Sequence, residues 1–435
     1  MLGRKYRLAQ RRMRRTQLGL IFAVVGPGII AANADNDASG IYGYSLAGAQ
    51  YGYGLLWVLV LVTISLAVCQ EMCARMGAVT GKGLADLIRE EYGVKITLLA
   101  MTALLVANFA TTVSELAGIS AAAGVFTENR AKVNGIIIAV SVIVWFMVTR
   151  GSYKRIERIL LAASLIYLLY IASAFMAHPH WGTVALQTVI PDRRIKYNGI
   201  YLFAVIQIIG TTITPWGQFY IQSSVRDKGI RAEDYALTRA DVLFGAFFTN
   251  FIAFFIVVCC GATLFHYGQD PKAIGDSFSD ATVIAKALVP VAGSLAATFF
   301  AIGLFNASCF GLITVPLSTA YAVTESLGWE SGLGRRVREA PLFIGVFTLL
   351  IAASTLVVIA APAKFLNILI LLPNTVGAAL LPIVLILMLR LINDKRIMGE
   401  YTNSRIFNLT AWTTTIVLII LSGALLVNQF LPGHN

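Results

Sequence analysis

Charged side chains are scarce in this sequence of 435 residues. Asp, Glu, Lys and Arg together account for 13% of it, whereas hydrophobic residues account for 57%. Soluble domains carry about 25% charged residues, so this composition excludes an ordinary soluble fold. Mean hydropathy is +0.76, and apolar runs of bilayer-spanning length recur from one end of the chain to the other. We therefore expect an all-α polytopic membrane protein in which residues 1–435 form a single transmembrane domain.

Cysteine and histidine are also rare, with five and four residues respectively. Cys69 and Cys73 are separated by three residues rather than two, and no histidine cluster accompanies them. This spacing argues against a zinc or redox site, and we expect free thiols within or beside apolar segments. The histidines fall in predicted loops or in the tail, at His178, His180, His266 and His434. No tightly bound cofactor is expected.

Eleven membrane-crossing segments, called spans here, are predicted from the apolar runs. Their boundaries are about 18–50, 53–74, 95–125, 134–149, 156–177, 199–224, 237–265, 288–323, 342–361, 364–390 and 407–430. Polar residues, glycine and proline interrupt span 1 at about 33–40 and span 6 near 211–217. A basic start followed by the apolar run 19–32 imitates a secretory signal, but Pro27 and the polar residues that continue into another helical stretch argue against cleavage.

The net charge of +12 would suggest nucleic-acid binding in a soluble protein. Here Lys and Arg lie between apolar spans, where they fix the topology, and no nucleic-acid partner is expected. The segment 4–15 and the loops after spans 2, 4, 6, 8 and 10 are basic, and the odd-numbered loops are poorer except for Arg193, Arg194 and Lys196. We therefore predict a cytoplasmic N-terminus and an extracytoplasmic C-terminus in the cell (inner) membrane. The lipid bilayer is one partner, and no obligate protein partner is inferred.

The break in span 1 contains two carboxylates, Asp35 and Asp37, and two carboxamides, Asn33 and Asn36. A charge at membrane depth costs roughly 2.5–3.5 kcal/mol on insertion scales, so it usually has a function. The carboxylates could instead lie at an interface or pair with a lysine, but no Lys or Arg occurs within the apolar body of any span. A bound cation is the simpler counter-charge. We expect one carboxylate to coordinate it and the other to face solvent or to cap a half-helix.

Span 6 is broken around Trp216 by Pro215 and Gly217. Proline donates no backbone hydrogen bond, so carbonyls near residue 211 are freed, and in a membrane they need another partner. The alternative is a simple kink stabilised by threonine hydroxyls. Breaks in spans 1 and 6 are what two five-helix units of opposite membrane orientation would give, and paired broken helices indicate the central site of a transporter. The units would cover about 18–177 and 199–392, followed by an extra helix at about 407–430.

Three stretches of the chain form a recognisable pattern. They are Gly26-Pro-Gly-Ile-Ile-Ala-Ala, Ala47-Gly-Ala-Gln-Tyr-Gly-Tyr-Gly-Leu-Leu-Trp-Val and Cys73-Ala-Arg-Met-Gly-Ala-Val-Thr-Gly-Lys-Gly-Leu-Ala-Asp. These stretches resemble the Nramp family of divalent-metal transporters. The resemblance is strong over spans 1 to 3 and recognisable in span 6. It implies a fold of the leucine-transporter type with two inverted five-helix repeats, divalent metal ions as transported partners, and no enzyme activity.

The resemblance also implies a set of metal ligands. Where the family carries Asp-Pro-Gly-Asn in span 1, a gap-free alignment places its Asp on Asp37, its ligand Asn on Gly40 and its carbonyl ligand on Ala34. In span 6 the family's Met-Pro-His becomes Thr214-Pro-Trp, and its carbonyl ligand falls on Thr211. One residue is inserted directly after this motif, so the register beyond it is open.

Hard oxygen ligands remain once the methionine and the asparagine are replaced. The implied metal-site residues are Asp37, Ala34, Gly40, Thr211, Thr214 and Gln218, and those lining the site are Asp35, Asn36, Trp216, Gly217 and Glu115. A thioether favours transition metals, whereas Mg²⁺ keeps several waters and takes only one or two carboxylates. The pattern therefore resembles the branch of Nramp-related magnesium transporters, and Mn²⁺ should also be accepted since it suits oxygen ligands.

Proton coupling in the family is associated with a His in span 6 and an Asp/Glu pair in span 3. Here Trp216 occupies the His position, Glu115 matches the Glu, and Thr112 stands in place of the Asp. We therefore expect transport of Mg²⁺ by alternating access without proton coupling. Two alternatives stay open. One is a proton-coupled Mn²⁺/Fe²⁺ symporter, and the other is an intramembrane aspartyl protease that would pair a span 1 carboxylate with Asp241 or Glu115.

Overall fold

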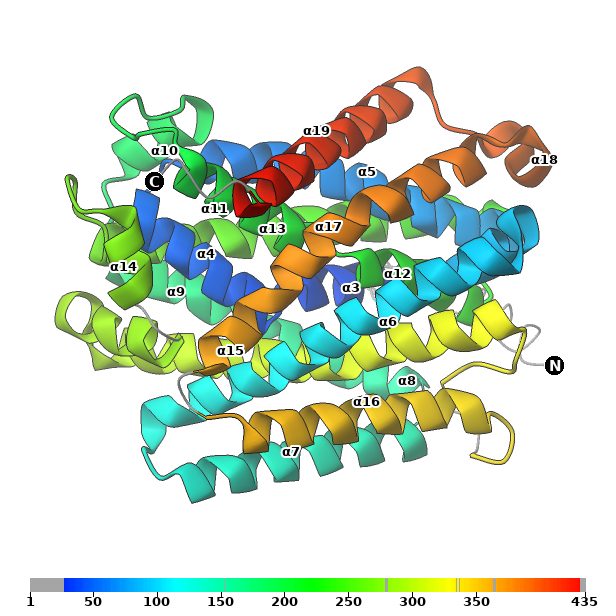
Figure 1. The fold of residues 1–435 in the computed structure, drawn as a ribbon, viewed down its shortest axis with the longest axis horizontal. Helices are drawn as coiled ribbons and strands as arrows, with labels where there is room; N and C mark the ends of the chain where they lie inside the picture. Colours follow the sequence, from blue (N-terminus) through cyan, green and yellow to red (C-terminus); the bar gives the residue numbers. More distant parts are fainter. Residues whose placement is uncertain are drawn as a thin grey trace, which may run out of the picture.

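The computed structural model describes residues 27–430, except 152, 278–280, 334, 336 and 363–364. Every regular element within these described residues is a helix (Figure 1). The first half contains α3 (Pro27–Asp35), α4 (Ala38–Tyr51), α5 (Leu56–Thr80), α6 (Leu84–Phe126), α7 (Arg130–Arg150), α8 (Tyr153–Ala163), η1 (Ser164–Tyr167), α9 (Leu168–Met176), α10 (Trp181–Val189), α11 (Gly199–Thr212) and α12 (Pro215–Asp227). The second half contains η2 (Ala232–Asp234), α13 (Tyr235–Thr263), α14 (Pro271–Ser277), α15 (Ala281–Leu327), α16 (Pro341–Ala360), α17 (Leu366–Asn393), α18 (Lys395–Met398), η4 (Gly399–Tyr401) and α19 (Arg405–Phe430).

Nine helical stretches in the described part of the chain are long and apolar enough to cross a membrane. They coincide with the predicted spans 2 to 10. Span 1 is represented by α3 and α4, with its beginning outside the described residues, and span 11 is represented by α19. The expected all-helical polytopic fold is therefore confirmed. The basic segment 4–15 and the last residues, 431–435, lie outside the described residues.

Two long helices carry a short arm before their membrane-crossing part. α6 and α15 kink at Gly93 (φ 75°) and Gly293 (φ 82°), a backbone conformation that other residues adopt only with strain. The predicted spans 3 and 8 begin close to these kinks. In addition, α10 and α14 occupy connections where the sequence predicts loops. They have nine and seven residues, too few to cross a bilayer, and they pack on α5 and α4 respectively.

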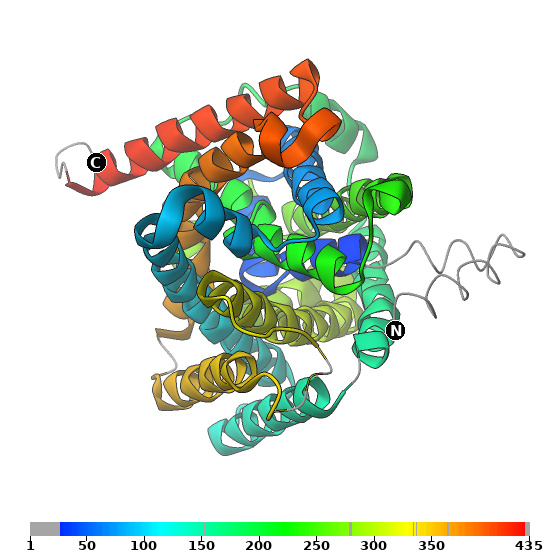
Figure 2. The same ribbon diagram turned by 90° about the vertical axis from the view of Figure 1, so that its right-hand side faces the viewer.

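The two broken spans lie at the centre of the bundle. α13 packs against α3, α4 and α5, whereas α12 packs against α5 and α15. α6 is paired with α15 along most of its length and also contacts α17. Figures 1 and 2 place α7 and α16 side by side at one edge of the bundle and α19 at the opposite edge. The polar residues of spans 1 and 6 are thus surrounded by helices on all sides rather than by lipid.

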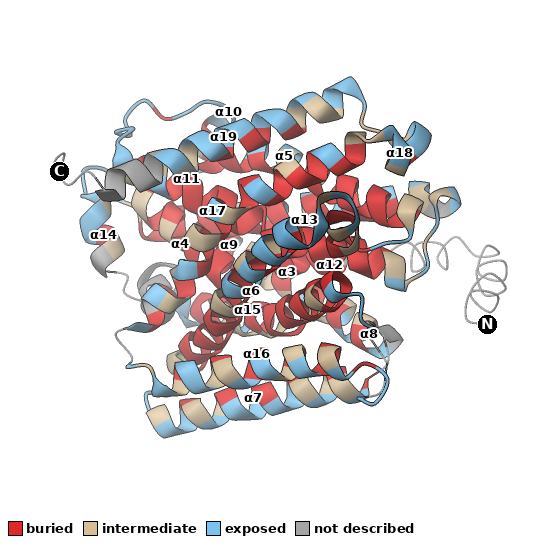
Figure 3. Cartoon of the chain, turned by 45° about the vertical axis from the view of Figure 1, so that its right-hand side comes forward, coloured by how far each residue is buried: buried red, intermediate tan, exposed pale blue. Residues whose placement is uncertain are grey.

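Burial follows the same division between centre and edge (Figure 3). The described side chains of α3 and those of α12 up to Val225 are buried. The edge helices expose large apolar side chains, among them Ile143 on α7, Leu349 on α16 and Ile420 on α19. An apolar outer face around a polar centre is the arrangement expected for a membrane-embedded bundle, because lipid solvates apolar side chains and leaves backbone and polar groups to be satisfied inside.

Helices α4 and α13 approach each other closely at Gly48. A Cβ atom at this position would lie 2.6 Å from the carbonyl oxygen of Val257 and 3.0 Å from both the Cβ of Cys260 and the backbone nitrogen of Gly261. Backbone atoms cannot rotate away as a side chain can. The contact therefore requires glycine, in the way that small residues generally allow membrane helices to pack.

We expect Gly48→Val to destabilise the protein by about 1–3 kcal/mol or more, the usual cost of forcing extra carbon atoms into a packed contact. The measurement is the thermal midpoint of the detergent-solubilised protein. Gly135→Val on α7 is the matched control, since nothing lies within 4 Å of a Cβ atom added there. Equal midpoints for the two variants would contradict the close approach of α4 and α13.

Ion pairs join several helices at the end of the bundle where the even-numbered loops lie. Arg226 at the end of α12 contacts Glu325 of α15 at 2.9 Å and Asp86 of α6 at 3.3 Å. On α5, Glu71 and Arg75 form a salt bridge of 3.0 Å, and Arg75 also donates to backbone carbonyls of the segment that precedes α19. These contacts hold the ends of α5, α6, α12, α15 and α19 together.

The basic loop between α10 and α11 is the exception to the alternation of charge among the loops. Arg194 in this loop pairs with Asp192 at 2.9 Å and stacks on the ring of Tyr267, 4.2 Å from its centroid. Hydrogen bonds from Arg194 hold the pKa of Asp192 below its usual value. Asp192 therefore stays ionised beside Arg194 and neutralises part of the positive charge of this loop.

Candidate metal-binding site

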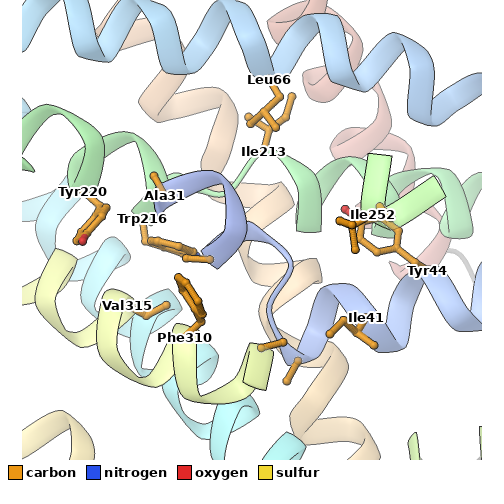
Figure 4. Packing of buried hydrophobic residues seen from close by; sticks show 14 of the residues in the cluster. Ala31, Ile41, Tyr44, Leu66, Ile213, Trp216, Tyr220, Ile252, Phe310 and Val315 are labelled. Atoms are coloured by element: carbon orange, nitrogen blue, oxygen red, sulfur yellow. The ribbon is translucent and has the colours of Figure 1, made fainter. Parts of the chain in front are cut away.

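Both broken spans are interrupted for two residues near the middle of the bundle. α3 ends at Asp35 and α4 begins at Ala38, whereas α11 ends at Thr212 and α12 begins at Pro215. The predicted breaks at 33–40 and 211–217 are confirmed, although each is shorter than expected. Figure 4 shows the two interruptions close together, with Ile213 packed against Leu66 on one side and Trp216 beside Ala31 on the other.

The break in span 1 is held open by polar groups from distant helices. The Tyr167 hydroxyl donates to the carbonyl oxygen of Asn33 at 2.9 Å and lies 3.2 Å from that of Asn36. The Asn36 carboxamide donates to the carbonyl oxygen of Thr249 on α13 at 2.9 Å. Tyr167 is the last residue of η1, a 3₁₀ turn between α8 and α9. Nothing local in the sequence points to Tyr167 or Thr249, so sequence reasoning missed both.

Two carboxylates satisfy the free N–H groups at the start of α4. Asp37 Oδ1 accepts hydrogen bonds from the Gly40 backbone nitrogen at 2.6 Å and from the Ser39 hydroxyl at 2.7 Å, which makes Asp37 the N-cap of α4. Glu115 Oε2 on α6 accepts from the backbone nitrogen of Ala38 at 3.2 Å. Because Ala38 donates to Glu115, its N–H group does not serve the carbonyl of Ala34, as it would in an unbroken helix.

The break in span 6 frees acceptors in a different way. Pro215 is the first residue of α12 and has no N–H group to donate to the carbonyl of Thr211. The Thr211 hydroxyl is buried as well and has no hydrogen-bond partner among the described residues. An unpartnered buried oxygen is costly unless something binds it. Thr211 thus offers two oxygens to a ligand, whereas sequence comparison indicated only its carbonyl.

Oxygens from both broken spans converge at Gly40. A Cβ atom built on Gly40 would lie 2.9 Å from Thr211 Oγ1, 3.2 Å from the carbonyl oxygen of Asp35 and 3.3 Å from Asp37 Oδ1. Three hard oxygens from the two broken spans therefore face one small region, and one of them belongs to a carboxylate with a formal negative charge. This donor set suits Mg²⁺, Ca²⁺ or Mn²⁺ better than a metal that prefers sulfur or imidazole.

A small cavity with both polar and apolar lining residues lies next to these oxygens. It is lined by Asp37, Thr214 and Trp216 from the broken spans and, among others, by Thr111 of α6 and Asn374 of α17. Its volume is about 10 Å³, close to the minimum for a single water molecule. An ion that keeps its complete water shell is larger than this. It would have to lose waters here, or the helices would have to move apart.

The side chain of Asp35 has different hydrogen-bond partners from that of Asp37. Its Oδ1 accepts a hydrogen bond from the Thr214 hydroxyl at 2.9 Å, and its Oδ2 accepts one from the Gln70 carboxamide on α5 at 2.7 Å. The missing side chain of Gly217 leaves room for this contact, since a Cβ atom there would lie 3.2 Å from Asp35 Oδ1. The side chain of Asp35 therefore ties span 1 to span 6, while that of Asp37 stays with its own half-helix.

The remaining predicted residues divide between the cavity and its surroundings. Trp216 lines the cavity and is buried, lying beside Phe310 in Figure 4. Gln218 lies deeper in α12, where its Oε1 accepts from the Cys73 thiol at 3.4 Å and its Nε2 donates to the Thr214 carbonyl at 3.4 Å. Gln218 thus supports the start of α12 beside the cavity rather than lining it. Gln70 was missed by sequence reasoning, although a glutamine within an apolar span is itself a signal.

Comparison with known proteins decides the family. The profile described as "Natural resistance-associated macrophage protein-like" (Nramp) matches residues 28–428, which is nearly the whole described chain. The chain belongs to the Nramp family. The sequence resemblance to this family is confirmed, and the chain is a multi-pass membrane protein of a transporter family rather than an enzyme. An aspartyl protease is therefore no longer a candidate.

Named relatives match the Nramp chain over almost their full length. The "Divalent metal cation transporter MntH" of Staphylococcus saprophyticus is 26% identical over 424 residues, covering 94% of this chain and 93% of the relative. The protein of the same name from Klebsiella pneumoniae is 24% identical over 415 residues, covering 94% and 95%. A crystal structure of the Eremococcus coleocola manganese transporter, in complex with an aromatic bis-isothiourea substituted compound, superposes with a TM-score of 0.72 at 20% identity. It covers 92% of this chain and 85% of that one. The leucine-transporter type of fold is confirmed by this match.

Proposed function

We propose that this Nramp protein transports divalent cations across the cell membrane, chiefly Mg²⁺ and also Mn²⁺, by alternating access. The observation that carries the proposal is the convergence of Thr211 Oγ1, the Asp35 carbonyl and Asp37 Oδ1 between the two broken spans. Half-helix ends and freed carbonyls that meet at the centre of a helical bundle form the ion sites of transporters with inverted repeats. The names of the relatives, which refer to divalent metal cations and manganese, support the same class of substrate.

The preference for Mg²⁺ rests on which side chains stand at the centre. Thr214 offers a hydroxyl where the family pattern has a thioether, and Gly40 offers no side chain where the pattern has a carboxamide. Mg²⁺ holds its waters strongly and needs few protein ligands, whereas a sulfur ligand would favour transition metals. Asp37 supplies the charge. The carbonyls of Ala34, Asp35 and Thr211 supply neutral oxygen together with the hydroxyls of Thr211 and Thr214. Together they fit a dication that keeps part of its water shell.

We propose further that transport proceeds without proton coupling. Trp216 carries no titratable group at the place of the family's histidine, and the Glu115 carboxylate already accepts the backbone N–H of Ala38. The membrane potential alone can drive a dication inward with about 4.6 kcal/mol at 100 mV. A second candidate is proton-coupled transport of Mn²⁺ or Fe²⁺. The name of the similar Eremococcus coleocola manganese transporter favours its metal, and Glu115 at the family position favours its proton coupling.

Orientation and repeat boundaries form part of the same proposal. The N-terminus lies in the cytoplasm and the C-terminus outside, as the basic even-numbered loops predict. The first repeat covers about 18–177, the second about 199–392, and the helix at about 407–430 is additional. The matching breaks α3/α4 and α11/α12, each two residues long, support this division because each falls in the first helix of its repeat.

The test is uptake by the purified protein reconstituted in liposomes. Mg²⁺, Mn²⁺, Ca²⁺ and Fe²⁺ are compared with an internal metal indicator, and an internal pH dye reports proton movement during the same assay. We expect Mg²⁺ and Mn²⁺ uptake that grows with an inside-negative potential and leaves the internal pH unchanged. Strong Fe²⁺ uptake without Mg²⁺ uptake would overturn the choice of metal, and acidification on adding Mg²⁺ would overturn the absence of proton coupling.

A further inference from the structure

We infer that Asp35 is a positioning residue for the transported cation, because it fixes the proton of the Thr214 hydroxyl and thereby presents the lone pairs of that oxygen to the ion. The inference rests on the proposed function and extends it to a carboxylate outside the family's span 1 motif. A hydroxyl group can bind a cation only when its hydrogen points elsewhere. Residues behind the ligands commonly perform this orienting task in metal sites.

The geometry determines the direction of the hydrogen bond between these two side chains. Both oxygens of the Asp35 carboxylate act as acceptors, Oδ1 for Thr214 and Oδ2 for Gln70. The Thr214 hydroxyl is the donor at Oδ1, as the Gln70 carboxamide is at Oδ2, so the shared proton belongs to Thr214. Asp35 is almost completely buried, with 2% of its surface exposed, and water does not compete for the contact.

The oxygen of Thr214 is also not used by its own helix. Thr214 is the N-cap of α12, a position where a threonine oxygen normally accepts a backbone hydrogen bond from the first turn. Here the side chain makes no such capping bond. Its hydroxyl donates to Asp35 while the residue lines the cavity next to Asp37. The lone pairs of Thr214 Oγ1 are thus left for a ligand.

Asp35 and Asp37 then have different roles, although only one residue separates them in the sequence. Asp37 places a formal charge where oxygens of both spans converge. The side-chain oxygens of Asp35 each accept one hydrogen bond, from Thr214 and from Gln70, and Asp35 is not among the residues that line the cavity, although its backbone carbonyl lies near Gly40. Its side chain acts on the ion through Thr214, and its effect should disappear when Thr214 has no hydroxyl.

The experiment measures Mg²⁺ and Mn²⁺ binding by calorimetry on the detergent-solubilised full-length protein. The variants are Asp35→Asn, Thr214→Val, Thr214→Ser and the double variant Asp35→Asn/Thr214→Val. The carboxamide has a single acceptor oxygen, so either Gln70 or Thr214 loses its acceptor, and an N–H group facing Thr214 would turn the hydroxyl hydrogen toward the cavity. We expect Asp35→Asn and Thr214→Val each to weaken binding about tenfold or more, within the range typical of orienting residues in metal sites.

The double variant and the conservative variant separate positioning from a general role in stability. We expect the double variant to bind no more weakly than Thr214→Val. Thr214→Ser keeps the hydroxyl and should lose much less affinity than Thr214→Val. Additive losses in the double variant, or unchanged binding by Asp35→Asn, would overturn the inference. If the unaltered protein binds Mn²⁺ but does not transport Mg²⁺, the proposal that Mg²⁺ is the transported metal is wrong. Non-additive losses of Mn²⁺ binding would still support the positioning role of Asp35.

Discussion

Replacing Asp37 by Asn is expected to abolish metal uptake while leaving the protein folded. Asp37 Oδ1 accepts both hydrogen bonds of the cap, from Gly40 and from Ser39. The single carbonyl oxygen of an asparagine can accept both, and asparagine is as good an N-cap as aspartate. The substitution therefore removes the formal charge from the converging oxygens and keeps the start of α4. Orienting groups behind a metal site change affinity about 10–100-fold, so loss of the charged ligand should exceed about 100-fold.

Three measurements on Asp37→Asn separate these effects. Metal uptake into liposomes and metal binding should both fall below detection, while the thermal midpoint in detergent stays close to that of the unaltered protein. Asp37→Ala removes the charge and the cap together, so it should lose uptake and in addition about 0.5–2 kcal/mol of stability. Ser39→Ala removes one hydrogen bond and keeps the charge, and it should retain uptake. Persistent uptake by Asp37→Asn would show that the ion passes elsewhere.

The second large effect is expected at Gly40, where sequence and structure give opposite predictions. Sequence comparison places a ligand asparagine of the family at this position, so Gly40→Asn should add a ligand. In the structure, however, the Cβ atom alone would approach Thr211 Oγ1 to 2.9 Å, with the Asp35 carbonyl and Asp37 Oδ1 at 3.2 and 3.3 Å. The new side chain would push apart the oxygens that we assign to the ion. We expect Gly40→Asn to reduce uptake by more than about tenfold.

The control for this variant lies one helical turn away on the same helix. A Cβ atom at Gly43 meets only the Asn374 carboxamide at 3.5 Å, an ordinary contact. Gly43→Ala should therefore transport almost normally, whereas Gly40→Ala should already lose much of the uptake. The comparison is made as initial rates of Mg²⁺ and Mn²⁺ entry into liposomes, normalised to reconstituted protein. Increased Mn²⁺ uptake by Gly40→Asn would favour the sequence alignment over the geometry described here.

The helical architecture could be predicted from the sequence because it depends on local features of the chain. Spans 2 to 10 follow from apolar runs, and the two breaks follow from carboxylates, glycine and proline that no continuous membrane helix tolerates without partners. The salt bridge between Glu71 and Arg75 likewise joins two residues that lie one helical turn apart in the sequence. The short helices α10 and α14 were not predicted, since seven to nine residues in a connection give too little periodicity to separate a helix from a loop.

The different roles of Asp35 and Asp37 in span 1 could not be predicted from the sequence. The sequence allowed one of them to bind an ion and the other to cap a half-helix, and Asp37 was expected to coordinate. In the structure Asp37 caps α4 and also faces the converging oxygens, while the carboxylate of Asp35 bonds to Thr214 and Gln70. These partners lie 35 and 179 positions away from Asp35. No local pattern encodes such distances.

The sequence by itself therefore determined that this is a helical membrane protein of the Nramp family, with polar breaks in spans 1 and 6 and few soft metal ligands. Only the tertiary structure decided which oxygens meet, that Tyr167 and Thr249 hold the first break open, and that Gly40 is needed where both breaks face each other. The physical reason is the distance along the chain over which each property is determined. Hydropathy and helix breaking are properties of a few neighbouring residues, whereas a buried oxygen finds its partner across the bundle, where the packing of helices brings distant side chains to within hydrogen-bonding distance.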